Sequence, residues 1–117
     1  MKRLILVLVL CWPVASYPAF LTGNKLMEQC DGTGKGEPHY HPRKYNACVA
    51  YLAANSDTTE AWQEGEFIKP KQMCLPEGVS AKQLRRAFLK YMRQHLDLWH
   101  SNAASLAADA FRESWPC

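Results

Sequence analysis

Two of the four histidines of this 117-residue chain, together with its cysteines, are the first residues whose types could do chemistry. His39 and His41, on either side of Tyr40, place two imidazoles close enough together to hold a metal ion. No third ligand follows at a spacing that metal sites use, and the neighbouring glycines and prolines indicate an exposed loop. A cysteine could act as a nucleophile beside a histidine only if its thiol stayed free and ionised. The state of the cysteines therefore decides whether such a site can exist.

A cluster of four carboxylates is the other candidate for acid–base chemistry: Asp57, Glu60, Glu64 and Glu66. Its spacing matches no described catalytic pair, and such a cluster is typical of the solvated end of a helix. The chain contains neither a Gly-x-Ser-x-Gly motif nor a glycine-rich phosphate-binding loop. We therefore expect a protein that is not an enzyme and that needs neither a cofactor nor a metal ion.

The first residues of the chain have the pattern of a secretory signal peptide. Two basic residues precede seven apolar residues, 4–10, and small side chains further on suit cleavage after Ser16. The apolar run is much shorter than the ~20 residues with which a helix spans a bilayer, so a retained anchor is the weaker interpretation. We expect export to the periplasm, with 1–16 removed as the signal peptide and 17–117 kept as the mature domain.

Removal of the signal peptide would leave 12 basic and 11 acidic side chains, and so a net charge of +1. A nearly neutral chain gives no electrostatic reason to expect nucleic acid or an anionic membrane surface as a partner. Its length suits one domain with one modest core. An even number of cysteines in an exported chain favours disulfides. The four that would remain are Cys30, Cys48, Cys74 and Cys117.

Apolar residues recur at helical spacing in four segments, which predicts an all-α, four-helix domain with long loops. The segments are 21–30, 44–57 with a continuation toward Trp62, about 80–99 and about 102–114. Ser80 and Gln83 form a capping box at the start of the third segment. The stretch 56–79 could add a short extended piece, but it does not predict a sheet.

Four cysteines allow three pairings, and the sequence alone does not choose among them. The expected helices favour one. Cys74 lies just before the third helix and Cys117 just after the fourth, and these positions meet if the two helices form a hairpin. Cys30 ends the first helix and Cys48 lies early in the second, so these two can approach across the loop. We therefore expect Cys30–Cys48 and Cys74–Cys117, each contributing about 3–4 kcal/mol in the chain-entropy model and leaving no thiolate for catalysis.

Four short patterns follow one another along the chain. They are Phe20-x-x-Gly23-Asn24-x-Leu26-x-x-x-Cys30, Cys48-x-x-Tyr51-Leu52-x-Ala54-x-x-Asp57, Met73-Cys74-Leu75-Pro76-Glu77-Gly78-Val79-Ser80-x-x-Gln83-Leu84 and Ala108-x-Ala110-Phe111-x-x-x-Trp115-Pro116-Cys117. In this order they resemble the Rap/Tai family of immunity proteins from bacterial type VI secretion loci, over about residues 20–117. The resemblance implies a small, mostly helical periplasmic protein that binds and blocks a peptidoglycan amidase effector, in some members as a homodimer.

An inhibitor of this kind needs no reactive group, because it works by placing a rigid protrusion over the cleft of the enzyme. Two segments could form one: the loop 32–42 and the stretch 60–71. The candidate partner-binding residues are His39, Tyr40 and His41 in the first, and Trp62 and Phe67 in the second. Trp62 and Phe67 fit the edge of a core better than a binding surface, whereas Tyr40 fits both equally.

Two other interpretations of the helical segments stay open. A row of cations along the third helix fits a solvated face or, alternatively, a docking surface for an acidic partner: Lys82, Arg86, Lys90 and Arg93. The helices could also enclose a lipid or another apolar ligand, which would make the protein a disulfide-stapled carrier. That carrier predicts an interior cavity lined by Leu84, Phe88, Met92, Leu106 and Phe111.

Overall fold

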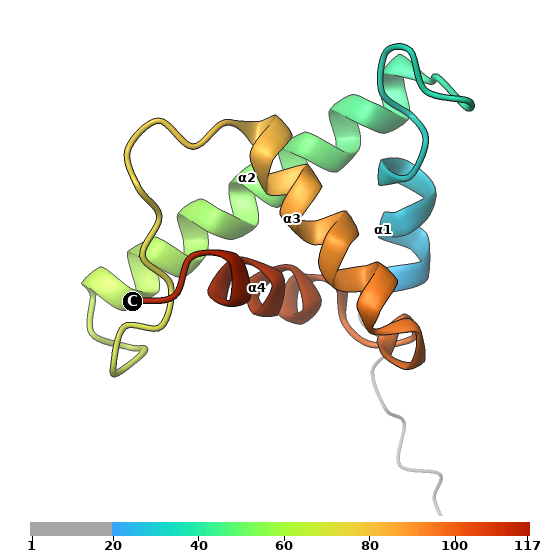
Figure 1. Ribbon diagram of the computed structural model, residues 1–117. Coiled ribbons are helices and arrows are strands. Elements are labelled where there is room, and N and C mark those ends of the chain that lie inside the picture. The colour runs from blue at the N-terminus through green and yellow to red at the C-terminus, as the bar shows by residue number, and fades with distance from the viewer. Residues whose placement is uncertain (1–19) are drawn as a thin grey trace, which may run out of the picture.

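Four α-helices and one 3₁₀ turn make up the part of the chain that the structure, a computed structural model, describes, residues 20–117 (Figure 1). The helices are α1 (Gly23–Cys30), α2 (Pro42–Glu64), α3 (Ala81–Gln94) and α4 (Ala103–Ser114), and the 3₁₀ turn η1 (Leu96–Leu98) lies between α3 and α4. Because no β-strand occurs within these residues, the all-α prediction is confirmed. The expected signal peptide, 1–16, lies outside the described residues. None of the helices described is long and apolar enough to cross a membrane.

α2 is longer than the helix that the apolar spacing predicted. It begins at Pro42, two residues early, because proline lacks the N–H that the first helical turn would leave unpaired. The His41 side chain accepts a hydrogen bond from the Lys44 N–H at 3.3 Å and so caps the helix. The expected continuation to Trp62 is confirmed, and the helix ends two residues further on, at Glu64.

The end of α3 differs from the prediction. Helical spacing predicted a helix as far as Trp99, but α3 ends at Gln94, and His95 has non-helical backbone angles. Trp99 instead folds back, and its indole N–H donates at 2.7 Å to the Met92 carbonyl, which also accepts from the His95 N–H at 3.2 Å. Leu96, which the spacing placed on the apolar face, is 69% exposed as a result.

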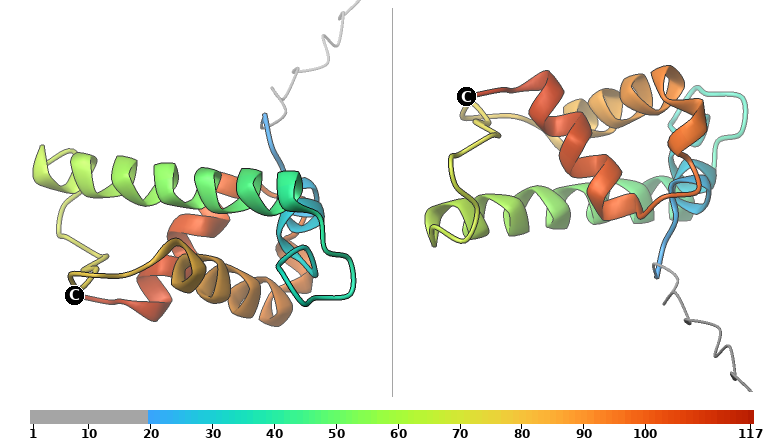
Figure 2. Two further views of the ribbon diagram at one scale, coloured as in Figure 1. Left: turned by 90° about the horizontal axis from the view of Figure 1, so that it is seen from above. Right: turned by 90° about the horizontal axis from the view of Figure 1, so that it is seen from below.

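The core lies between α2, which contacts the other three helices, and the pair formed by α3 and α4 (Figure 2). The side chains that the carrier hypothesis placed around a cavity all belong to this one core cluster and are at most 5% exposed: Leu84, Phe88, Met92, Leu106 and Phe111. Because these side chains fill the interior, the structure argues against a carrier.

The start of α1 lies against the junction of α3 and α4. The Gly23 N–H donates to the Ser101 carbonyl at 2.9 Å, and the Asn24 N–H donates to the Trp99 carbonyl at 2.8 Å. A Cβ atom on Gly23 would lie only 2.6 Å from Leu106 Cδ1. The close approach of the two segments therefore depends on a residue without a side chain.

Two disulfides join the helices in the pairing that the expected elements favoured. Cys30–Cys48 links the end of α1 to α2, and Cys74–Cys117 links the segment before α3 to the chain end after α4. The Cys74 N–H also donates to the Trp115 carbonyl at 2.9 Å. The second disulfide therefore closes the α3–α4 hairpin, as expected.

Candidate partner-binding site

The histidines and cysteines do not assemble a reactive centre in the described chain. Within residues 20–117, no three metal-binding side chains gather at one point. His39 and His41 are both exposed, and the His41 ring caps α2. The four cysteines of this range are all held in disulfides. What the described surface offers a partner is therefore the shape and charge of its loops and helices.

The loop between α1 and α2 is held firmly although its tip is exposed. The Cys30–Cys48 disulfide closes its base. Thr33, only 2% exposed, donates its hydroxyl hydrogen toward two carbonyls at the end of α1, at 2.8 and 3.2 Å. The His39 N–H donates to the carbonyl of Gly32, whose positive φ of 70° turns the chain. These contacts fix the backbone that carries the candidate residues.

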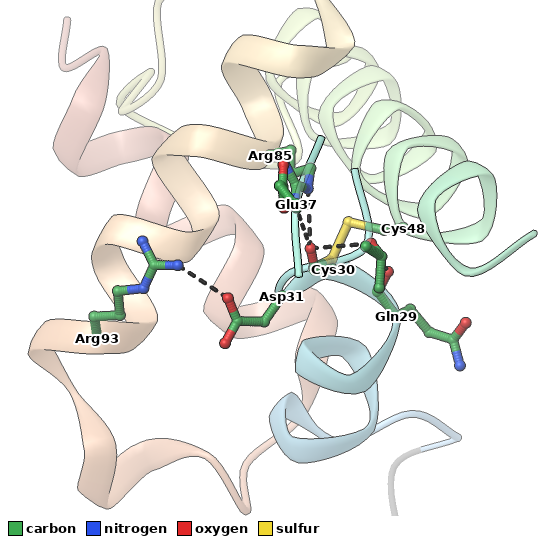
Figure 3. A network of polar contacts seen from close by, with 8 residues as sticks. Gln29, Cys30, Asp31, Glu37, Cys48, Arg85 and Arg93 are labelled. Carbon is green, nitrogen blue, oxygen red and sulfur yellow. Dashed lines mark hydrogen bonds and ion pairs between the residues drawn. A yellow bond between two sulfur atoms is a disulfide. The ribbon is translucent and has the colours of Figure 1, made fainter. Parts of the chain in front are cut away.

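Arg85 of α3 clamps the same loop from the side of the helix (Figure 3). Its Nε and Nη2 donate to the Cys30 carbonyl at 3.0 and 2.6 Å, and its Nη1 donates to the Glu37 carboxylate at 3.0 Å. The guanidinium carbon also lies 5.2 Å from the centre of the Tyr45 ring. The hydrogen bond from Arg85 holds the pKa of Glu37 below its usual value of 4.5, so the pair is charged at neutral pH.

A second protrusion follows the end of α2. Gly65 caps the helix, Glu66 has a positive φ of 63°, and the Phe67 N–H donates back to the Trp62 carbonyl at 2.9 Å. The two aromatic rings contact each other with centroids 5.6 Å apart. Trp62 is nevertheless 53% exposed and Phe67 78% exposed. The expectation that these two side chains lie beneath a core edge is therefore wrong, because the tight turn carries both outward.

Gln63 holds this second protrusion from the inside. Its side chain is 5% exposed, and its Nε2 donates to the Met73 carbonyl at 2.8 Å. Its Oε1 accepts hydrogen bonds from the N–H groups of Gln72 and Met73, both at 3.0 Å. One side chain thus satisfies three backbone groups of the returning segment.

The two protrusions stand at opposite ends of α2 (Figure 2). A helix of 23 residues is about 35 Å long at 1.5 Å per residue. The structure brings His39, Tyr40 and His41 together at one end, with Tyr40 55% exposed, and Trp62 beside Phe67 at the other. A single enzyme cleft can therefore receive one of these groups but not both.

Comparison with known proteins decides the family. The sequence model of the Rap1a immunity proteins matches residues 22–117, which include all four helices and both protrusions. The chain belongs to the Rap1a immunity protein family. Neither a curated protein nor a solved structure matches the chain. A Rap1a immunity protein is not an enzyme, and its role implies a cognate effector as partner.

Two residues that hold the candidate surface in this Rap1a protein were missed by the sequence analysis. Arg85 lies at the edge of the apolar face of α3, next to Leu84 and one helical turn before Leu89. This position was the only sign in the sequence that the Arg85 side chain is partly buried. Gln63 carried no signal, because its backbone partners lie 9 and 10 residues further along the chain. Both residues act by fixing loops and contribute no reactive group.

Proposed function

We propose that this Rap1a immunity protein acts in the periplasm, where it binds and occludes a peptidoglycan amidase delivered by a type VI secretion system. The family match over residues 22–117 carries the proposal. Two disulfides, together with the family, favour an extracytoplasmic protein. The four ordered sequence patterns support an amidase as the effector, through their resemblance to the Rap/Tai proteins.

Occlusion requires a preformed surface and no catalytic group. A stable complex of this kind buries about 1,200–2,000 Å² in total. Loops that are already fixed lose less conformational entropy on binding, and both protrusions meet this condition. The first is held by Cys30–Cys48 and Arg85, and the second by Gln63.

Each protrusion is a candidate for the part that enters the cleft. Tyr40 with His39 and His41 offers an amphipathic tip, while Trp62 and Phe67 offer an apolar one. Because the exposed rings of Tyr40 and Phe67 contribute little to the core, Tyr40→Ala and Phe67→Ala should leave the fold intact. The variant that loses inhibition identifies the protrusion that blocks the cleft.

Co-purification and genetics test the proposed function. The protein should co-purify with the effector encoded beside it, and cells lacking the protein should become sick only while they carry that effector. If deleting the effector leaves such cells just as sick, the protein does not act as its immunity partner. A homodimer stays a prediction, and the mass of the purified protein in solution tests it.

A further inference from the structure

An exposed row of three cations runs along α3. Lys82, Arg86 and Lys90 are spaced four residues apart, so they lie on one side of the helix, and all three are exposed. Like charges at this spacing repel one another and oppose helix formation. We call these three residues the α3 cation row.

Four cations of the described chain pair with carboxylates, whereas the three of the α3 cation row do not. Five further cations of this part of the chain, Lys25, Lys35, Arg43, Lys44 and Lys71, are also unpaired, and the row differs from them in lying along one side of a single helix. Lys69, Arg85, Arg93 and Arg112 each pair with a carboxylate. Arg93 is the next cation along α3, and its Nη2 lies 2.9 Å from Asp31 Oδ1 (Figure 3). Within residues 20–117, no carboxylate lies within ion-pair distance of the α3 cation row. Its charge is therefore available to a partner.

The α3 cation row stands between two surface grooves, and Arg86 lines both. One groove, of about 440 Å³, lies between α3 and α4 and contains Tyr91, Glu113 and Trp115. The other, of about 530 Å³, lies between α3 and the α1–α2 loop. The second groove is lined by Lys35 and Tyr40 of the loop opposite Lys82 and Arg86. The cation row and the Tyr40 protrusion thus form one continuous surface.

We propose that this continuous surface is where the effector docks, through an acidic segment that lies along the α3 cation row. The inference rests on the proposed function and specifies it, because it assigns the contact to the Tyr40 end of α2. Tyr40, at the rim, would supply the aromatic anchor, and the cations would steer the acidic segment into register. The Trp62–Phe67 end then lies outside the interface.

The charge pattern favours an acidic protein over an anionic membrane. The described residues 20–117 contain 12 basic and 11 acidic side chains, so the domain as a whole is nearly neutral. Membrane attraction of this type uses clusters of about 4–8 cations, and the row has three. Glu113 lines the groove between α3 and α4 and would repel an anionic lipid surface, whereas the charge of Glu37 in the other groove is paired with Arg85. Alternating signs at fixed positions suit a partner that carries its own pattern of charge.

A pair of charge-reversal variants tests the proposal. Lys82→Glu with Arg86→Glu disrupts the row, and Lys25→Glu with Lys71→Glu makes the same change in net charge at two exposed positions outside both grooves. Circular dichroism should show the same helix content for both variants. Association with the purified effector, measured by stopped flow or surface plasmon resonance, should slow about tenfold or more for the row variant at low salt. The difference should shrink as salt is raised, and the control should stay within about twofold of the wild type.

The possible outcomes separate the two proposals. If the two double variants slow association with the effector equally, or if neither slows it, the proposed docking surface is wrong. The proposed function is unaffected by that result. Loss of binding in Phe67→Ala but not in Tyr40→Ala also overturns it. The wild-type protein could bind anionic phospholipid vesicles while the row variant does not, with effector binding the same for both. That result would assign the row to a membrane and refute the proposal. A wild-type protein that does not bind the effector at all refutes the proposed function itself.

Discussion

Replacing Arg85 with methionine removes the clamp on the α1–α2 loop while keeping an unbranched side chain over the Tyr45 ring. The change deletes charge-assisted hydrogen bonds to two groups, the Cys30 carbonyl and the Glu37 carboxylate. Such bonds contribute about 1.5–3 kcal/mol each. The Glu37 side chain is 36% exposed and regains water, so its share is discounted. We expect the free energy of unfolding to fall by about 2–3 kcal/mol.

Thermal unfolding of the oxidised protein measures this loss. One kcal/mol shifts the Tm of a domain of this size by roughly 4–8 °C, so Arg85→Met should melt about 10–20 °C below the wild type. Arg93→Met is the matched control, because it removes an exposed ion pair from the same helix and should cost at most about 1 kcal/mol. If Arg85→Met melts no lower than Arg93→Met, the clamp contributes nothing beyond a surface ion pair and the reasoning fails.

Three further changes test how the loops and helices are fixed. Gln63→Leu leaves two buried backbone groups and one partly buried group without partners and should cost about 2–4 kcal/mol in urea unfolding, whereas a cost below about 1 kcal/mol would show that water replaces the side chain. Gly23→Ala forces a Cβ against Leu106 and should cost about 1–3 kcal/mol by the same measurement, and an unchanged midpoint would mean that α1 shifts freely. The pKa of Glu37 is lower in the folded protein than its usual 4.5, so its contribution to stability is complete above that value and is lost as the pH falls through the folded pKa. Wild type should therefore lose stability in acid more steeply than Glu37→Gln, and parallel curves of Tm against pH would contradict this.

The sequence predicted the features that depend on local chemistry. The Ser80–Gln83 capping box forms, with the Ser80 N–H donating to Gln83 Oε1 at 2.7 Å. The pairing of Cys74 with Cys117 followed from their places at the two ends of a helix hairpin. Periodicity and capping residues act within a few positions of each other, so a single sequence displays them.

Features set by tertiary contacts were not predictable in the same way. α3 stops at Gln94, although apolar spacing continues to Trp99, and the Met92 carbonyl accepts from the His95 N–H and from the indole of Trp99. Phe67 is an apolar aromatic residue of the kind usually found in a core, but it is exposed because the turn that follows α2 directs it outward. Arg85 reaches a carbonyl 55 residues away along the chain. Such contacts depend on how distant segments pack, which local periodicity does not encode.

We propose above all that this Rap1a protein inhibits a peptidoglycan amidase by covering its cleft. The direct measurement is the rate at which the purified effector hydrolyses peptidoglycan as the oxidised protein is added. We predict that activity falls to the background level at a fixed, small molar ratio and that the substrate competes with the protein for the cleft. Full amidase activity in the presence of excess protein, or a partner effector without amidase activity, would contradict the account.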